Sequence, residues 1–143
     1  MTLNSILYSI SNEKRKNGNQ AKRTMSGEQQ TILIVEDELL IKEFMIAVLK
    51  DEGYNILETD CGDEAVQIFI DRYEDIDLVL LDMQMPDKNG AEVLEELQFI
   101  DANVKAFFVS GVVVDWESLG AIGILQKPFQ AKDLAKAVRD ILT

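Results

Sequence analysis

The sequence contains no histidine and a single cysteine, Cys61, among its 143 residues. One cysteine cannot form a disulfide within the chain, and zinc sites built from cysteine and histidine need ligands that this composition does not supply. A disulfide scaffold and the common zinc modules are therefore excluded. The composition fits a reducing compartment, and we expect the protein in the cytoplasm.

Long apolar runs are also missing, although 47% of the residues are apolar. No run approaches the roughly 20 residues that a membrane-spanning helix needs, so we expect no membrane insertion. Residues 1–10 lack the basic start of a secretory signal. The apolar residues are instead numerous enough for one domain with its own core.

Positive charge is scarce, because 14 Lys and Arg residues face 26 Asp and Glu residues and the net charge is -12. The imbalance is uneven along the chain, since residues 1–30 carry +3 and leave -15 on the remainder. So acidic a domain lacks the cations that a phosphate backbone requires. We therefore expect no direct contact with nucleic acid.

The composition divides the chain into a polar start and a domain. Residues 1–29 are basic and rich in polar residues beyond Ser11, which predicts a flexible tail, and residues 30–143 form the domain. Alternatively, four apolar residues at helical spacing could form a small docking face: Leu3, Ile6, Leu7 and Ile10. Ten residues make a marginal helix in water, so we favour the tail, or a native start at Met25.

Short apolar runs alternate with helical patterns from Thr31 onward. Runs without strict polar alternation are typical of strands that a parallel sheet buries on both faces. They predict strands at 31–35, 54–58, 77–81, 104–109 and 122–126. Apolar spacing predicts four helices, with inner faces at Ile41, Phe44, Met45 and Val48; at Ala65, Ile68 and Phe69; at Val93, Leu94, Leu97 and Ile100; and at Leu134, Ala137, Val138 and Ile141. This succession predicts an α/β fold with a doubly wound five-stranded parallel sheet.

Three acids follow two of the predicted strands. Glu36 and Asp37 come directly after the first strand, and Asp82 comes directly after the third. Ligands of open parallel sheets bind outside the carboxyl ends of the strands, and strands one and three are neighbours in the order 2-1-3. Three carboxylates so close repel unless a cation lies among them, and oxygen ligands alone favour Mg²⁺. Alternatively, each acid only caps the helix that follows it.

Two further polar side chains end the last two strands, Ser110 after the fourth and Lys127 after the fifth. Pro128 restricts Lys127 to extended geometry, which indicates a specific bend. The ammonium and the hydroxyl could both contact a phosphoryl group, although alone these residues would be a surface charge and a helix cap. A carboxylate beside a divalent cation and a lysine is well placed to attack phosphorus, so Asp82 is a candidate nucleophile.

Taken together, these residues resemble the receiver domains of response regulators. The resemblance rests on four ordered motifs: ILIVEDE at 32–38, LLDMQMPDKNG at 80–90, VSG at 109–111 and KPF at 127–129. Each motif is weak alone, but the ordered combination is specific. For residues 30–143 the resemblance implies a flavodoxin-like sheet with strand order 2-1-3-4-5.

The resemblance also implies a function in two-component signalling, as a single-domain phosphoacceptor of a phosphorelay. Asp82 would take a phosphoryl group from a histidine kinase or a histidine phosphotransfer protein, in a Mg²⁺-dependent reaction. The modified domain would then signal by protein–protein contact. Such a protein catalyses only its own phosphorylation and dephosphorylation and is not otherwise an enzyme.

The other site residues follow from the same resemblance. Lys127 would hold a phosphoryl oxygen, Ser110 would turn toward it, and the bond from Lys127 to Pro128 would be cis. The magnesium ligands would be Asp37, Asp82, the main-chain carbonyl of Gln84 and, through water, Glu36.

Two features depart from the family pattern. Three residues before Lys127, where these domains commonly carry a Tyr or Phe that swings inward on activation, this chain has Ile124. Only 16 residues separate Ser110 from Lys127, fewer than such domains use. Receiver domains have a further helix, their fourth, between the fourth and fifth strands. We therefore expect that this helix is shortened to one or two turns at Asp115–Leu119, or that an irregular segment replaces it. Trp116 would pack over the resulting gap or anchor a partner.

Other functions remain as alternatives. The main one is a phosphorylation-independent protein-binding module, a pseudo-receiver with a degenerate switch, which Ile124 and the reduced helix favour. A phosphatase with an aspartate nucleophile needs a second carboxylate two residues later, where Gln84 stands. A flavin carrier is disfavoured because the acidic first loop would repel an anionic phosphate unless a metal intervened.

Overall fold

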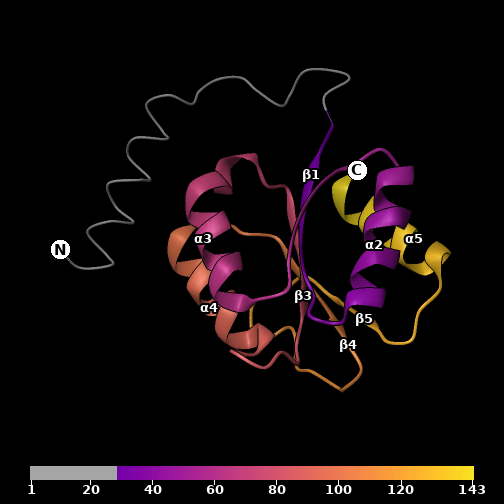
Figure 1. Cartoon of the computed structure of the whole chain (residues 1–143). Coiled ribbons are helices and arrows are strands. Elements are labelled where there is room, and N and C mark those ends of the chain that lie inside the picture. The colour runs from indigo at the N-terminus through magenta and orange to yellow at the C-terminus, as the bar shows by residue number, and fades with distance from the viewer. Residues whose placement is uncertain (1–28) are drawn as a thin grey trace.

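One sheet of five parallel strands runs through the centre of the molecule, in the order β2-β1-β3-β4-β5 (Figure 1). The predicted fold class and strand order are thereby confirmed. The computed structural model describes residues 29–143, so the tail expected at 1–29 lies outside the described residues except for its last one. The strands are β1 (Thr31–Val35), β2 (Asn55–Thr59), β3 (Leu78–Asp82), β4 (Ala106–Ser110) and β5 (Ile124–Gln126).

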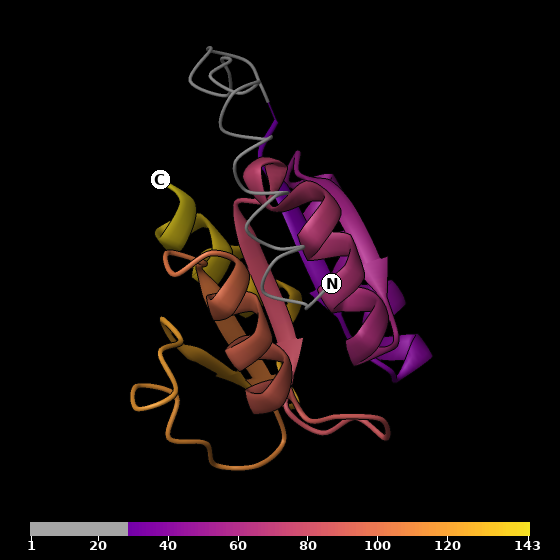
Figure 2. The same ribbon diagram turned by 90° about the vertical axis from the view of Figure 1, so that its left-hand side faces the viewer.

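Helices cover both faces of the sheet. In Figure 1, α2 (Leu39–Asp51) and α5 (Ala131–Leu142) lie on one side, and α3 (Gly62–Arg72) and α4 (Gly90–Ile100) lie on the other. Figure 2 looks onto the layer formed by α3 and α4. The short 3-10 helix η1 (Tyr73–Asp75) follows α3. Within residues 29–143, no helix has the combined length and apolar character that crossing a bilayer requires.

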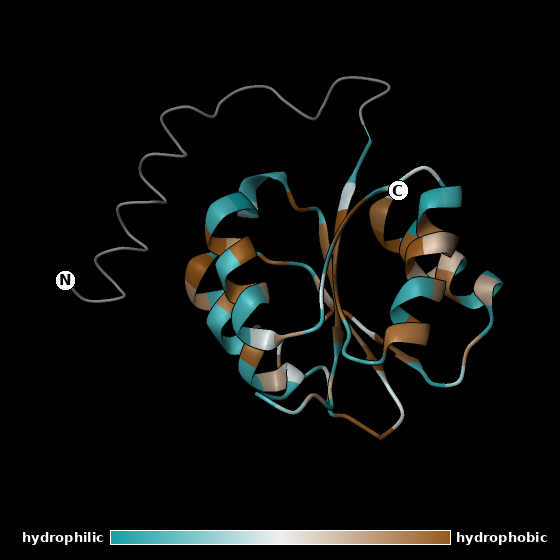
Figure 3. Cartoon of the chain, viewed as in Figure 1, coloured by the Kyte–Doolittle hydropathy of each residue, from teal (hydrophilic) through white to brown (hydrophobic). Residues whose placement is uncertain are grey.

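An apolar cluster on each face of the sheet joins these layers. Figure 3 shows the apolar residues along the central strands and on the inward sides of the helices. Successive side chains of a strand point to opposite faces, so each central strand contributes to both clusters. This double burial is the reason that their sequences are apolar without alternation. The largest buried contributions from the helices come from Phe69, Leu94 and Leu97 on one face and from Met45, Leu49 and Leu134 on the other.

Four of the five strands begin later than the sequence predicted, β2 and β3 by one residue and β4 and β5 by two. Strand β4 starts at Ala106 instead of residue 104, and β5 starts at Ile124 instead of residue 122. Val104 belongs to a turn, in which its N–H donates to the carbonyl of Asp101 at 3.1 Å. Val104 and Ile122 are apolar although they lie outside the paired strands, so the sequence pattern could not mark where sheet pairing begins.

Helix α2 buries a slightly different stripe from the predicted one. Met45 and Leu49 are buried, but Phe44 is 41% exposed. The Phe44 ring packs instead against Phe129, with the ring centroids 6.0 Å apart. Phe129 follows β5, so this contact joins α2 to the segment between β5 and α5.

Residues 111–123, between β4 and β5, run as turns and bends, and no helix lies in this part of the described structure. The irregular segment was therefore the correct alternative to a short helix at Asp115–Leu119. Trp116 and Leu119 pack against the cluster beside α3 and α4, which confirms the packing role of Trp116. The Gln98 amide of α4 donates to the carbonyl of Leu119 at 3.0 Å and fastens the segment.

Helix α3 is capped from another part of the chain. Its own N-cap residue, Cys61, makes no capping bond through its side chain. The carboxylate of Asp87, in the loop between β3 and α4, accepts the N–H groups of Gly62 at 3.2 Å and Asp63 at 3.1 Å. Slight burial acts to raise the pKa of Asp87, but these hydrogen bonds outweigh it and lower the pKa.

Lys88 fastens the same loop a second time. Its Nζ lies 2.8 Å from Asp63 Oδ1 of α3 and 2.5 Å from Glu96 Oε2 of α4. The stem of Lys88 crosses Gly62, where an added Cβ would come within 2.5 Å of Lys88 Cγ. The loop that follows Asp82 is thus fixed to both helices on this face.

Replacing the capping carboxylate should weaken the fold. We expect Asp87→Ala to lower the free energy of unfolding by about 1 kcal/mol at neutral pH, because two N–H groups of α3 lose their acceptor. Since the folded pKa is lowered, this contribution is present above the ordinary carboxyl pKa and is lost as the pH falls through the folded value. Urea unfolding measures the change. Asp87→Asn keeps an acceptor oxygen and should retain most of the stability; an alanine variant as stable as the wild type would refute the cap.

Candidate functional site

Three carboxylates meet at the carboxyl ends of β1 and β3. Glu36 and Asp37 follow β1, and Asp82 is the last residue of β3. The two strands are paired neighbours, with Val35 opposite Leu81. One oxygen from each carboxylate lies within 4.8 Å of the other two. The structure thus brings together the three acids that the sequence singled out.

Glu36 and Asp82 are largely removed from water, and Asp37 is partly buried. Glu36 is 1% exposed and Asp82 is 3% exposed. Burial, followed by the charge of Glu36, raises the pKa of Asp82, while burial and the neighbouring Asp82 raise the pKa of Asp37. Among the described residues, Asp37 Oδ1 is buried with no hydrogen-bond partner. The cluster is therefore electrostatically unfavourable unless further positive charge is supplied.

Lys127 supplies one positive charge from the end of β5. Its Nζ lies 2.8 Å from Glu36 Oε1, 3.2 Å from Glu38 Oε1 and 3.5 Å from Asp82 Oδ1. Burial acts to lower the pKa of Lys127, but the pairing with Glu36 outweighs it and raises the pKa, so the ammonium remains charged. The bond from Lys127 to Pro128 is cis, which confirms the prediction.

The Asp82 carboxylate is oriented by the loop that follows it. The N–H of Gln84 donates to Asp82 Oδ1 at 3.2 Å. Helix α4 begins close beneath, at Gly90, where an added Cβ would lie 2.6 Å from the carbonyl oxygen of Asp82. A glycine is therefore required for this close approach. The predicted role of the Gln84 carbonyl as a magnesium ligand stays a prediction.

Ser110 ends β4 and is fully buried. Its hydroxyl donates to the carbonyl of Val112 at 3.1 Å and accepts the N–H of Val112 at 3.0 Å. The side chain is thus engaged with its own loop. A turn of this hydroxyl toward a phosphoryl group would exchange both bonds for new ones, and that role also stays a prediction.

Glu38 is a site residue that the sequence patterns did not single out. Its carboxylate contacts Lys127, while its N–H donates to Glu36 Oε2 at 3.1 Å. The available signal was its place as the third acid in a run of three, but such acids often lie on a solvated turn. Asp87 was missed for the same reason, since its capping partners lie 24 and 25 positions away.

The donor set of the cluster fits a hard divalent cation. All three side chains offer oxygen, and the Asp37 oxygen without a hydrogen-bond partner is an available ligand. With Lys127 among Glu36, Asp37 and Asp82, two negative charges remain to be balanced. A cation such as Mg²⁺ would balance both, and the residues present therefore fit it.

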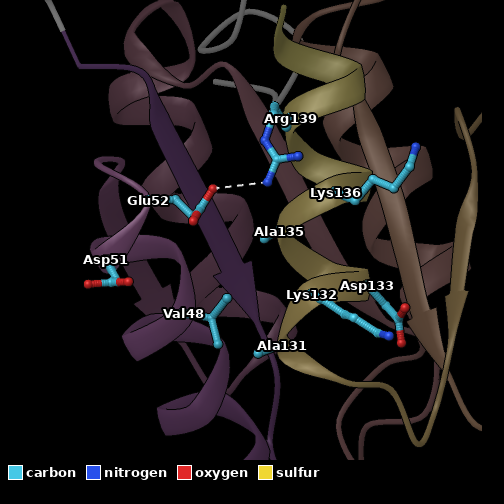
Figure 4. Close-up of a pocket in the computed structure, with 9 residues that line it drawn as sticks. All are labelled: Val48, Asp51, Glu52, Ala131, Lys132, Asp133, Ala135, Lys136 and Arg139. Carbon is cyan, nitrogen blue, oxygen red and sulfur yellow. Dashed lines mark hydrogen bonds and ion pairs between the residues drawn. The ribbon is translucent and has the colours of Figure 1, made fainter.

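Two grooves lie on the face formed by α2 and α5. One, of about 450 Å³, adjoins the acid cluster and is mostly apolar. Its residues are Glu38, Leu40, Ile41, Phe44, Lys127, Pro128 and Phe129. The other, of about 610 Å³, runs between α2 and α5 (Figure 4). Figure 4 shows the ion pair of Arg139 with Glu52, at 3.3 Å, across the upper part of this second groove.

Comparison with known proteins gives consistent matches over the described domain. The model of the family described as response regulator receiver domain matches residues 32–139. Sensor kinase CckA of Brucella abortus is 35% identical over 117 residues, covering 78% of this chain and 12% of that protein. The aerobic respiration control protein ArcA of Escherichia coli is also 35% identical over 117 residues, covering 78% of this chain and 48% of ArcA. The chain thus spans half or less of the length of these relatives.

Solved structures share the fold. The structure of response regulator protein TrrA from Thermotoga maritima, in complex with Mg²⁺ and BeF, has a TM-score of 0.72 and 31% identity, covering 80% of this chain and 100% of that chain. A chain of the CheX–CheY–BeF₃–Mg²⁺ complex from Borrelia burgdorferi has a TM-score of 0.78 and 25% identity, covering 85% of this chain and 95% of that chain.

The acid cluster predicts that Asp82→Asn stabilises the metal-free protein and weakens its stabilisation by Mg²⁺. A raised carboxylate pKa means that ionisation destabilises the fold, a cost fully present above the folded pKa, so metal-free Asp82→Asn should unfold at a higher temperature than the wild type at pH 7. Saturating Mg²⁺ should stabilise the wild type more, because the variant has lost one ligand. Thermal unfolding with and without Mg²⁺ gives both comparisons. Equal Mg²⁺ stabilisation of the two proteins would argue against Asp82 as a ligand.

Proposed function

The chain belongs to the response regulator receiver domain family, and we propose that it accepts a phosphoryl group on Asp82 from a phosphohistidine donor in a Mg²⁺-dependent reaction. The observation that carries the proposal is the buried Asp82 carboxylate, with Lys127 Nζ at 3.5 Å and the Asp37 carboxylate beside it. A nucleophile, a cation and a metal-binding acid are together the minimum for phosphoryl transfer.

In the proposed reaction, a carboxylate oxygen of Asp82 attacks phosphorus as the bond to the imidazole nitrogen of the donor breaks. The electron pair of that bond leaves with the imidazole, and Asp82 carries an acyl phosphate. The N–H of Gln84 orients the attacking carboxylate through its bond to Oδ1. Lys127 then holds a phosphoryl oxygen, and the Ser110 hydroxyl turns toward the same group.

Bound Mg²⁺ would neutralise charge on the transferring group and on the carboxylates around it. Its proposed ligands are Asp37, Asp82, the main-chain carbonyl of Gln84 and, through water, Glu36. Removal of Asp37 should therefore weaken phosphorylation without removing the nucleophile.

The proposed donors are a histidine kinase or a histidine phosphotransfer protein, and the output is protein–protein contact. The apolar groove between α2 and the Lys127–Phe129 segment supports docking beside Asp82, because Leu40, which lines it, and the adjacent Leu39 are 79% and 60% exposed. The relative CckA is named a sensor kinase, which is consistent with such a partner.

The remaining features of the proposal follow from the composition. The -15 charge of the domain disfavours direct nucleic-acid binding. We propose a cytoplasmic location, a tail at 1–29 and a receiver domain at 30–143, with no turnover of other substrates.

Asp82 should be the residue that is modified. Incubation with acetyl phosphate and Mg²⁺ should add one phosphoryl group, seen by intact mass spectrometry, because the small donor needs no partner protein. Asp82→Asn should lose the addition, since an amide oxygen is a poor nucleophile. Asp87→Asn, a change of the same kind in the loop that follows Asp82, should retain it. An unchanged wild-type mass at saturating donor would defeat the proposal.

A second candidate is the phosphorylation-independent binding module. Three observations favour it: Ile124 stands where the family commonly has an aromatic ring, residues 111–123 are irregular, and the Ser110 hydroxyl is bonded to Val112. Each of these would weaken the conformational change that follows phosphorylation, or would alter which residues take part in it.

Beryllofluoride, which mimics the phosphoryl group, separates the two candidates. For a working receiver we expect altered amide exchange at Ser110 and along residues 111–123, because the Ser110–Val112 bonds must be exchanged. Exchange measured by mass spectrometry with and without beryllofluoride gives the map. Changes confined to the residues that contact the ligand would instead favour the binding module.

A further inference from the structure

Glu38 is the N-cap residue of α2, yet its side chain makes no capping hydrogen bond to the helix. Asp, Asn, Ser and Thr are the residues that favour such a position. The Glu38 side chain extends instead to Lys127, 89 positions later, with Oε1 at 3.2 Å from Nζ.

This contact completes the surroundings of the Lys127 ammonium. A lysine has three N–H donors, and three carboxylates face this one: Glu36 at 2.8 Å, Glu38 at 3.2 Å and Asp82 at 3.5 Å. The contact with Glu38 is a hydrogen bond, so a phosphoryl oxygen that arrives at Asp82 competes with Glu38 for the ammonium.

The three acceptors differ in what their release would cost. The Glu36 side chain is 1% exposed and the Asp82 side chain 4%, so either would leave a buried charge without its partner. The Glu38 side chain is 59% exposed and can return to water. Glu38 is thus the acceptor that the ammonium gives up most readily.

We propose, resting on the proposed function of Asp82, that Glu38 is a positioning residue that holds Lys127 in a resting arrangement and thereby restrains phosphorylation. Release of Glu38 frees one donor of Lys127 for the phosphoryl oxygen. The chain therefore sets its own phosphorylation rate through an exposed acid that is neither a magnesium ligand nor the nucleophile.

Three variants separate this contact from a general effect of charge. Glu38→Gln removes the charge, and Glu38→Asp keeps the charge but shortens the reach to Lys127. Glu43→Gln removes a charge from another exposed residue of α2 and is the matched control. All three are compared with the wild type for the initial rate of acyl phosphate formation from acetyl phosphate and Mg²⁺, by intact mass.

We expect both Glu38 variants to react roughly two- to fivefold faster than the wild type, the factor that corresponds to an exposed ion pair of ordinary strength. Glu43→Gln should react at the wild-type rate. A Glu38→Gln rate equal to that of Glu43→Gln would overturn the proposal. A wild-type rate in Glu38→Asp would assign the effect to charge alone, and a slower rate in either Glu38 variant would mean that Glu38 assists Lys127.

A second measurement does not depend on phosphorylation. Lys127 should be labelled faster by an amine-reactive ester in both Glu38 variants than in Glu43→Gln and the wild type, as read by peptide mass mapping. If no variant accepts a phosphoryl group, the proposed function fails, and the labelling alone decides whether Glu38 restrains Lys127. Equal labelling of Lys127 in all four proteins would refute the restraint.

Discussion

The site depends on the ion pair between Lys127 and Glu36. Lys127 comes from the end of β5 and Glu36 from the end of β1, and β3 and β4 lie between these strands. The pair at 2.8 Å therefore spans the ends of both intervening strands, where Asp82 and Ser110 stand. Without it, the Glu36 carboxylate, which is 1% exposed, would be a buried charge without its partner. The Lys127 ammonium that stabilises the buried acids at this edge of the sheet is also the group that would bind a phosphoryl oxygen.

The two loops beside Asp82 are held in different ways. The loop after β3 is fixed by Asp87 to α3 and by Lys88 to both α3 and α4. The loop after β4 is held at Ser110 by two hydrogen bonds to Val112 and then continues without regular structure. A rearrangement at Ser110 and Val112 exchanges these two local hydrogen bonds and need not break the bond from Gln98 to Leu119 farther along the segment. Asp82 therefore lies between a fixed loop after β3 and a loop after β4 that can rearrange.

Most of the fold could be predicted because it depends on local apolar patterns. The runs at β1, β3 and β4 are buried on both faces, and their ends could be read from the polar residue that follows each run. The acid cluster followed from strand order, since the ends of neighbouring strands converge. Glu38 and Asp87 could not be assigned in this way, because their partners are distant in sequence and depend on side-chain reach. For the segment between β4 and β5, only the number of residues was informative. That number allowed a short helix as well as turns.

The irregular segment between β4 and β5 also contains the only tryptophan of the chain, Trp116. Its indole packs against the cluster beside α3 and α4, while the next residue, Glu117, is exposed to solvent. Indole emission depends on the polarity around the ring. The unlabelled protein therefore carries its own optical reporter, and its fluorescence spectrum follows this one segment without interference from another indole.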